Sequence, residues 1–271
     1  MPELPEVETT CRGISPHILD ETVSEIIIRQ KQLRWPVTPG LKQGITGQRI
    51  TYVSRRGKYI LLGTGAGTAI IHLGMSGNLR IVEQSTAVRK HDHVDILFSN
   101  HKVLRLHDPR RFGALLWTKD NPLEHELLIE LGPEPLTEDF TADYLHTLSR
   151  RRKASVKTFI MNSHVVVGVG NIYASESLFL AGIHPTRRAD KISLPRYELL
   201  VKAIKKVLVA SIKQGGTTLR DFVNENGQPG YFQQTLNVYG RGGEACNQCG
   251  HVISVSRQLQ RSTFYCRHCQ K

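Results

Sequence analysis

Four cysteines near the end of this chain constrain its fold more than any other feature. Two residues lie between Cys246 and Cys249, and after sixteen intervening residues Cys266 and Cys269 repeat that spacing. Such pairs are typical of a four-thiolate zinc site, whereas two disulfide bonds would need an oxidising compartment. Four protein ligands leave no position for water, so we expect one structural zinc ion. The sequence therefore predicts a small metal-stabilised ribbon with Arg261 between the cysteine pairs, suited to contact nucleic acid.

The length and charge of the chain agree with such a partner. With 271 residues, a prior of roughly 150 residues per domain predicts about two domains. Lys and Arg number 36 against 24 Asp and Glu, a net charge of +12 that favours a polyanion as partner. We find no apolar run of the ~20 residues that a membrane helix needs, and no secretion signal at the N-terminus. We therefore expect a soluble cytoplasmic protein without a membrane partner.

Hydrophobic periodicity divides the chain into two parts. Short apolar runs cut by turns between Ser24 and Trp117 predict an antiparallel β-domain, with cations at the turns 55–58 and 99–102. A short helix that starts at Pro5 and ends near Gly13 is expected before it. The proline-rich segment 131–135 predicts a linker. Beyond it, apolar residues recur with helical spacing, so we expect a mainly α second domain whose long last helix is followed by a loop at 215–230.

Two further segments are candidates for chemistry. Gly168 and Gly170 precede a predicted helix that Asn171 can cap, where free N–H groups could bind phosphate, although glycine-rich helix starts are also common without a ligand. Once Met1 is removed, Pro2 is a terminal amine beside Glu3 and Glu6. Such an amine is far more often neutral at pH 7 than a lysine, so it can attack carbon and form a Schiff base. A terminus that merely caps the helix is the alternative interpretation.

Several motifs occur together in one order: MPELPEVET, Gly57-Lys58-Tyr59, the segments 72–77, 90–93, 108–113 and 168–173, Gly240-Arg241, and the four-cysteine ribbon. In these motifs the chain resembles the bacterial formamidopyrimidine-DNA glycosylases, which repair 8-oxoguanine, over its whole length. The resemblance implies an α+β fold with an N-terminal antiparallel β-sandwich flanked by helices. It also implies a C-terminal helix-two-turns-helix domain with a four-cysteine zinc finger.

The resemblance implies domain bounds as well. Residues 1–131 correspond to the catalytic β-sandwich domain with the N-terminal proline, 132–142 to a linker, and 143–240 to the helix-two-turns-helix DNA-binding domain. Within the latter, residues 215–232 correspond to a lesion-capping loop. Residues 241–271 correspond to the zinc finger.

Site residues also follow from the resemblance. It implies that Pro2 is the nucleophile at C1′ and Glu3 the acid, with Lys58 and Arg261 needed for the chemistry. The remaining expected sites are DNA contacts at His91, Arg110, Arg152, Lys157 and Asn171, a base-displacing wedge of Met75, Arg110 and Phe112, and a lesion pocket that includes Glu6, Thr217 and Thr218. From the sequence alone Met75 and Phe112 would more often be core residues than wedge residues, but the glycines beside them favour loops.

The resulting prediction is a bifunctional glycosylase and AP lyase of base-excision repair. We expect it to remove oxidised purines from double-stranded DNA, to cleave the abasic site by β,δ-elimination, and to act as a monomer associated with the bacterial nucleoid. Two alternatives remain at this point. One is an oxidised-pyrimidine glycosylase like endonuclease VIII, and the other is a zinc-ribbon protein that binds DNA without catalysis.

Overall fold

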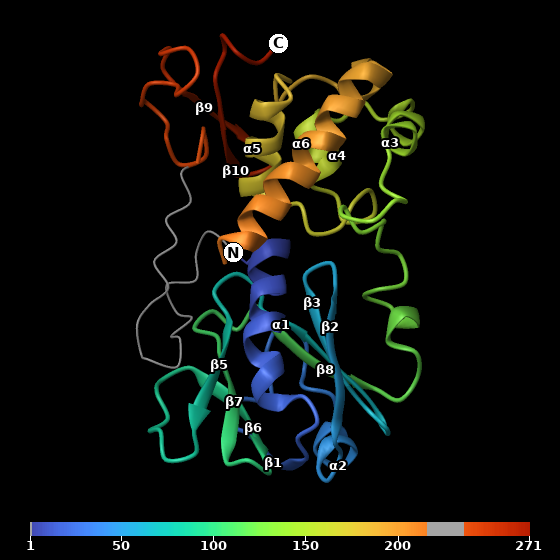
Figure 1. Ribbon diagram of the computed structural model, residues 1–271, viewed down its shortest axis with the longest axis vertical. Helices are drawn as coiled ribbons and strands as arrows, with labels where there is room; N and C mark the ends of the chain where they lie inside the picture. The colour runs from blue at the N-terminus through green and yellow to red at the C-terminus, as the bar shows by residue number, and fades with distance from the viewer. Residues whose placement is uncertain (1, 216–235) are drawn as a thin grey trace. The chain divides into compact units, whose positions relative to one another are not determined.

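The chain folds into two units, which divide between Glu130 and Leu131 (Figure 1). The structure is a computed structural model that describes residues 2–215 and 236–271. No helix in this described part is long and apolar enough to cross a membrane.

Unit 1 is a sandwich of two antiparallel sheets. One sheet has the strand order β1-β6-β7-β5 and the other the order β2-β3-β4-β8. Residues that alternate along the strands bury their apolar side chains in one shared core, as the period of two predicts. The strands are β1 (Val23–Ile28), β2 (Ile50–Arg56), β3 (Tyr59–Thr64), β4 (Gly67–His72), β5 (Asn78–Glu83), β6 (Asp92–Phe98), β7 (Lys102–His107) and β8 (Ala114–Thr118).

Helix α1 (Leu4–Ile18) closes one side of this core. The predicted apolar face is confirmed, because Val7, Cys11 and Ile14 are all buried. The expected end near Gly13 is wrong, since the helix continues through Pro16 to Ile18. A glycine costs a helix about 1 kcal/mol, whereas burying an isoleucine contributes about 1.5–3 kcal/mol, and Ile14 and Ile18 are both completely buried. Unit 1 also contains the short helices α2 (Leu41–Ile45) and η1 (Pro122–Glu124).

Unit 2 is mainly helical and has its own core. The predicted linker is held on this unit, because Gly132 N–H donates to Ser163 O and Pro133 O accepts from Val167 N–H. Helix α4 was not predicted, since five residues are too few to show a helical period. The helices are α3 (Ala142–Ser149), α4 (Val156–Ile160), α5 (Asn171–Leu180), η2 (Ala189–Lys191) and α6 (Leu194–Lys213).

The C-terminal ribbon packs against α5. Its hairpin consists of β9 (Ser254–Gln258) and β10 (Arg261–Tyr265). Phe179 of α5 shares a small core with Val238 and Ile253. The buried carboxylate of Glu176 accepts hydrogen bonds from the backbone N–H groups of residues 237, 238 and 239 at 2.9 Å, which fixes the chain as it enters the ribbon.

Candidate functional site

The N-terminus of α1 carries the first group of predicted site residues. Pro2 is partly exposed, and the next residue, Glu3, caps the helix. Glu3 and Glu6 form a capping box in which Glu3 N–H donates to Glu6 Oε2 at 2.8 Å, and both side chains are 1% exposed. A helix N-terminus favours negative charge, so two carboxylates are fixed directly beside Pro2.

The β2–β3 hairpin carries Lys58. Gly57 takes the positive φ of 56° that its two-residue turn requires, and Lys58 follows it. Arg55 connects this hairpin to α1, because its Nε donates to Glu8 Oε2 at 2.7 Å. Burial alone would raise the pKa of Glu8, but hydrogen bonds and charge from Arg12 and Arg55 outweigh it and hold the pKa below its ordinary value. In Figure 1 this hairpin tip lies at the same end of unit 1 as the start of α1.

His72, at the end of β4, lies within the electrostatic influence of Lys58 and is bonded to the next loop. Burial, followed by the charges of Lys58 and Arg34, lowers the pKa of His72 to about 4. The neutral ring therefore accepts a hydrogen bond at Nδ1 from Gly74 N–H at 3.0 Å. A protonated ring could not accept this bond.

The three predicted wedge residues lie on two loops that touch. Met75 and Phe112 are each 42% exposed, which excludes the core alternative for both. A Cβ at Gly74 would lie 2.4 Å from the backbone carbon of Phe112, so only glycine permits this close approach. The guanidinium of Arg110 stacks 4.7 Å from the Phe112 ring centroid.

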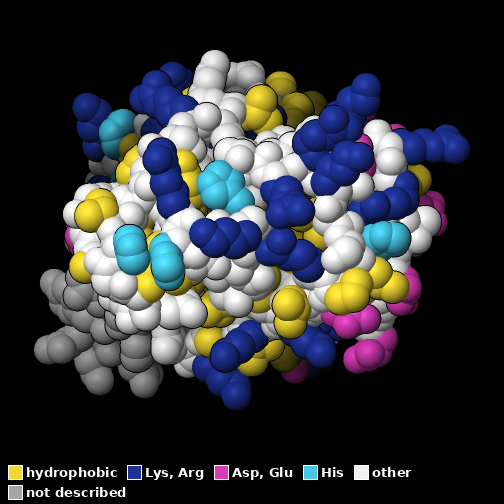
Figure 2. All heavy atoms as spheres, turned by 90° about the horizontal axis from the view of Figure 1, so that it is seen from above, with side chains coloured by type: hydrophobic (Ala, Val, Ile, Leu, Met, Phe, Trp, Pro, Cys, Tyr) yellow, Lys and Arg dark blue, Asp and Glu magenta, His cyan; other side chains and the backbone are white. Residues whose placement is uncertain are grey.

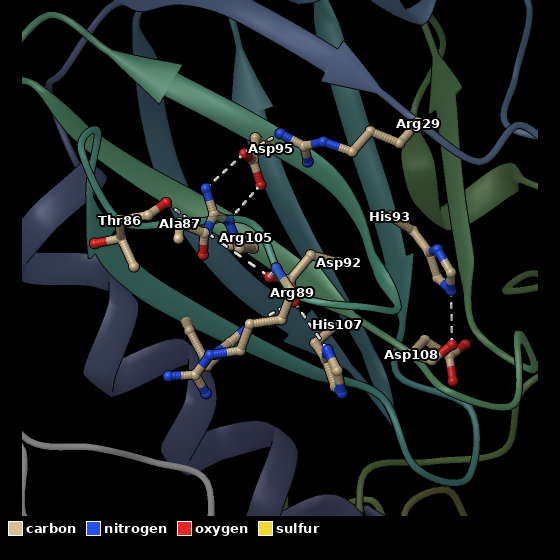
Figure 3. A network of polar contacts seen from close by, with 11 residues as sticks. Arg29, Thr86, Ala87, Arg89, Asp92, His93, Asp95, Arg105, His107 and Asp108 are labelled. Carbon is tan, nitrogen blue, oxygen red and sulfur yellow. Dashed lines mark hydrogen bonds and ion pairs between the residues drawn. The ribbon is translucent and has the colours of Figure 1, made fainter.

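Asp108, which the sequence interpretation did not single out, joins the two loops. Its buried carboxylate accepts hydrogen bonds from Gly113 N–H at 2.7 Å and from Ser76 Oγ at 3.3 Å. Its carbonyl oxygen lies 2.8 Å from Nε2 of His93 (Figure 3). The predicted wedge residues therefore lie on loops that one carboxylate connects.

Residues 84–91 connect β5 to β6 and are called the β5–β6 segment. His91 is the last residue of this segment. The residue is partly exposed and has a φ of 75°. Beneath the segment lies a buried ionic network that the sequence interpretation missed, built on Asp92, Asp95 and Arg105 (Figure 3). A signal was available, since Asp95 and Arg105 each stand between apolar residues of their strand and face each other in the β6–β7 register.

In unit 2, Lys157 joins the zinc hairpin to α5. Its side chain is 1% exposed, and Nζ donates to Asn171 Oδ1 at 2.6 Å, Thr263 Oγ1 at 2.8 Å and Ser262 O at 3.2 Å. Asn171 Nδ2 also donates to Ser262 O. The expected cap by Asn171 is therefore wrong: Gly170 is the N-cap of α5, and Asn171 turns toward the hairpin because a buried ammonium needs acceptors.

The tip of the zinc hairpin presents Arg261. The two turn residues, Leu259 and Gln260, both have positive φ, which is costly for residues other than glycine. Gln258 helps to hold this turn, because its Oε1 accepts from Ser155 Oγ at 2.6 Å. The tip and α4 enclose a pocket of about 390 Å³ whose lining includes three predicted contacts, Arg152, Lys157 and Arg261.

Positive charge also predominates on one face of the molecule. Figure 2 views the molecule from the end where the C-terminus lies in Figure 1, and Lys and Arg far outnumber Asp and Glu on that face. A surface of this charge attracts phosphate at long range.

The four cysteines form a metal-binding cluster. Their sulfur atoms all lie within 4.8 Å of one another, with Cys246 and Cys269 at 3.9 Å and Cys249 and Cys266 at 3.4 Å. Tetrahedral Zn–S bonds of about 2.3 Å require sulfur atoms about 3.8 Å apart, so the cluster fits zinc. The predicted lesion-pocket residues Thr217 and Thr218, and the capping loop beyond Gly215, lie outside the described residues.

Three family profiles match the chain. They are the formamidopyrimidine-DNA glycosylase N-terminal domain at residues 1–115, the formamidopyrimidine-DNA glycosylase H2TH domain at 131–223, and the zinc finger found in FPG and IleRS at 243–271. Together with the sulfur cluster, these matches confirm the predictions of the α+β fold and of one structural zinc.

Full-length relatives agree with the profiles. Formamidopyrimidine-DNA glycosylases of Methylococcus capsulatus and Shewanella halifaxensis are 58% and 55% identical over 271 residues, with both chains covered completely. A crystal structure of the Lactococcus lactis Fpg in complex with DNA that contains N7-benzyl-Fapy-dG matches with a TM-score of 0.91, 33% identity and complete coverage of both chains.

The titration of His72 predicts a specific loss of stability in acid. Its pKa is about 4 in the folded chain and about 6.5 when unfolded, so the unfolded state takes up a proton first as the pH falls. Between pH 7 and 4.5 the wild-type chain should therefore lose roughly 2–3 kcal/mol more unfolding free energy than His72→Asn, whose Oδ1 can still accept from Gly74 N–H. Urea titrations followed by the fluorescence of Trp35 and Trp117, which both lie in unit 1, measure this. Parallel pH profiles for the two proteins would contradict it.

The zinc site predicts that Cys249→Ser releases the metal. With one thiolate removed, the ribbon should lose its zinc and its hairpin structure, because so small a module is held together by its metal. Metal analysis of the purified protein checks this. Cys11→Ser is the matched control, since Cys11 is buried in unit 1 and its pKa is raised to about 12, mainly by burial. It should retain a full complement of zinc, and equal loss from both variants would refute the assignment.

Proposed function

This chain belongs to the formamidopyrimidine-DNA glycosylase family, and from that premise we propose how its own residues perform the reaction. The protein is a base-excision repair glycosylase whose partner is double-stranded DNA with oxidised purines. The observation that carries the proposed mechanism is the arrangement at α1, where Pro2 is followed by Glu3, whose buried carboxylate caps the helix.

The proposed first step is attack by the Pro2 amine. After removal of Met1, the nitrogen lone pair bonds to C1′ of the damaged nucleoside, and the base leaves with the electrons of its glycosidic bond. The attached nitrogen then loses its proton to the carboxylate of Glu3, the C1′–O4′ bond opens to give an iminium ion, and Glu3 passes that proton to O4′. Lys58, held near this end of unit 1 by its hairpin, contributes a positive charge beside the phosphates.

Strand cleavage follows from the same iminium ion. The iminium acidifies C2′, so loss of a proton there expels the 3′ phosphate, and a second elimination expels the 5′ phosphate. We propose that Arg261 grips a phosphate and assists the second elimination, and that Lys157, Asn171 and Arg152 complete this anion site in unit 2. The support is that three of these side chains line one pocket and Asn171 bonds Lys157.

Base extrusion needs a second group of residues. Removing a base from the stack costs a few kcal/mol, which inserted side chains can offset. We propose that Met75 and Phe112 intrude between base steps and that Arg110 bonds the orphaned partner base. Their exposure on two connected loops supports this. His91 would contact the backbone, and Glu6, with Thr217 and Thr218, would lie near the extruded base.

The family assignment also helps to choose between the alternative functions and to place the domain bounds. The relatives are named as formamidopyrimidine enzymes, which favours oxidised purines over pyrimidines and catalysis over binding alone. We propose the domain bounds 1–131, 132–142, 143–240 and 241–271, supported by the division at Glu130 and by the profile limits. Association with the nucleoid is likewise a proposal that rests on duplex DNA as the partner.

Blocking the Pro2 amine should abolish both base excision and strand cleavage, because one nitrogen performs the attack and then carries the imine. A chain with a short N-terminal extension should give no covalent adduct with lesion DNA in the presence of borohydride. The same chain after proteolytic removal of the extension up to Pro2 is the control, and it should recover full trapping. Undiminished trapping by the extended chain would place the nucleophile elsewhere.

Arg110→Ala should reduce the preference for cytosine opposite the lesion. One good base contact is worth about 1–3 kcal/mol of discrimination, so the ratio of excision rates between cytosine and a mismatched partner should fall by roughly tenfold. Arg111→Ala is the matched control, because Arg111 is also exposed and its replacement by alanine removes the same charge. If Arg110→Ala discriminates as well as the wild type does, the partner base is bound by another side chain.

A further inference from the structure

The β5–β6 segment (residues 84–91) is attached to unit 1 by buried charged side chains. Arg105 Nη1 donates to the carbonyl oxygens of Thr86 and Ala87, both at 3.1 Å. At the other end of the segment, Arg89 N–H donates to Asp92 Oδ2 at 2.8 Å. Figure 3 shows both attachments converging beneath the segment. An exposed segment without strand or helix is therefore anchored at two points.

Nη1 of Arg105 is directed at the segment because Asp95 binds the other two nitrogen atoms of the guanidinium. The Arg105 side chain is almost completely buried, and Nε and Nη2 bind the two carboxylate oxygens of Asp95 at 2.8 and 2.9 Å. This bidentate pairing fixes the plane of the guanidinium, so Nη1 points at the segment. Asp95 is also bonded by Nη2 of Arg29, which lies on its other side.

Asp92 is held just as firmly. Its Oδ1 accepts from Arg80 Nη2 at 2.5 Å and lies 2.8 Å from His107 Nδ1. Burial would raise the pKa of Asp92, but hydrogen bonds from Arg89 N–H and His107, together with the charge of Arg80, bring it below its ordinary value. The carboxylate is thus ionised near neutral pH and remains an acceptor for the segment.

The conformation of His91 shows why anchoring is needed. Its φ of 75° lies in the left-handed region, which costs a residue other than glycine energy unless its surroundings hold it there. The backbone is fixed on the far side too, because Asp108 N–H donates to His91 O at 3.0 Å. His91 follows directly on the anchored residues and immediately precedes Asp92, so any release of the segment would let its ring turn away.

We propose that Arg105 and Asp92 are positioning residues for the DNA contact at His91. They touch no DNA themselves and act by fixing the backbone from Thr86 to His91. The inference rests on the proposed function only in taking His91 as a contact to the DNA backbone. Beyond that function, the buried side chains of Asp92 on β6 and Arg105 on β7 decide whether His91 makes its contact.

The test is a double-variant cycle on binding to an abasic duplex. Arg105→Lys keeps the charge beside Asp95 but cannot span both Asp95 and the two carbonyl groups. We expect Arg105→Lys and His91→Ala each to weaken binding about tenfold, as expected for one hydrogen bond to a charged group. The double variant should be weakened by the same tenfold, because the two changes remove one contact. Arg29→Lys, which alters the same network away from the segment, should bind like the wild type.

Other outcomes would overturn the proposal. Three results would show that Arg105 does not act through His91. They are normal binding by Arg105→Lys, an additive loss of affinity of about a hundredfold in the double variant, and an equal loss of affinity in Arg29→Lys. Normal binding by His91→Ala would remove both this inference and the proposed contact at His91. Borohydride trapping by the same variant would still report on the Pro2 mechanism separately.

A second pair of variants tests the Asp92 anchor without replacing any buried charged side chain. Arg89→Pro removes the backbone N–H that donates to Asp92, and Arg89→Ala removes the same side chain but keeps that N–H. We expect Arg89→Pro to bind several-fold more weakly than Arg89→Ala, and the difference to vanish when His91 is also replaced by Ala. If Arg105→Lys fails to fold, this comparison still tests whether anchoring of the segment supports the contact at His91. Equal affinities of the two Arg89 variants would overturn the proposal.

Discussion

Buried charged side chains hold the segments that carry most of the proposed DNA contacts. A charge removed from water is costly unless hydrogen-bond partners surround it, so such a side chain gathers backbone groups from several loops and fixes them. Asp108 does this for the two loops that carry the proposed wedge residues, and Arg105 does it for the β5–β6 segment. In unit 2, Lys157 does the same for the zinc hairpin, and Glu176 for the chain that enters it.

This principle explains how an irregular surface can perform a reaction that depends on geometry. Loops have few backbone partners of their own, whereas the proposed attack at C1′ and insertion beside a base both need accurately positioned side chains. In unit 1 the anchors are side chains on or next to sheet strands, so the rigidity of the sandwich extends to its loops. In unit 2 the zinc site and α5 supply that rigidity, because Lys157 bonds both Asn171 and the β10 backbone.

Local patterns explain which features were predictable. Strands β2 to β7 and helices α1, α3, α5 and α6 have the periods of two and 3.6 that side chains on one buried face require, and these periods can be read from a single sequence. Helix α4 is too short to show a period. The length of α1 and the role of Asn171 were predicted wrongly, because burial of Ile18 and the acceptor needs of Lys157 depend on residues far away in the chain.

The sequence by itself determined the class of each part: the sandwich strands, the helical second half, the zinc ligands and, through motifs in order, the family. These properties depend on residue type and short spacing, which folding does not change. Only the tertiary structure decided how the contact residues are presented. The pairing of Arg105 with Asp95, the joining of two loops by Asp108 and the burial of Lys157 bring together residues separated by ten to more than a hundred positions. Such partners are chosen by the packing of sheets and helices, and no local pattern records them.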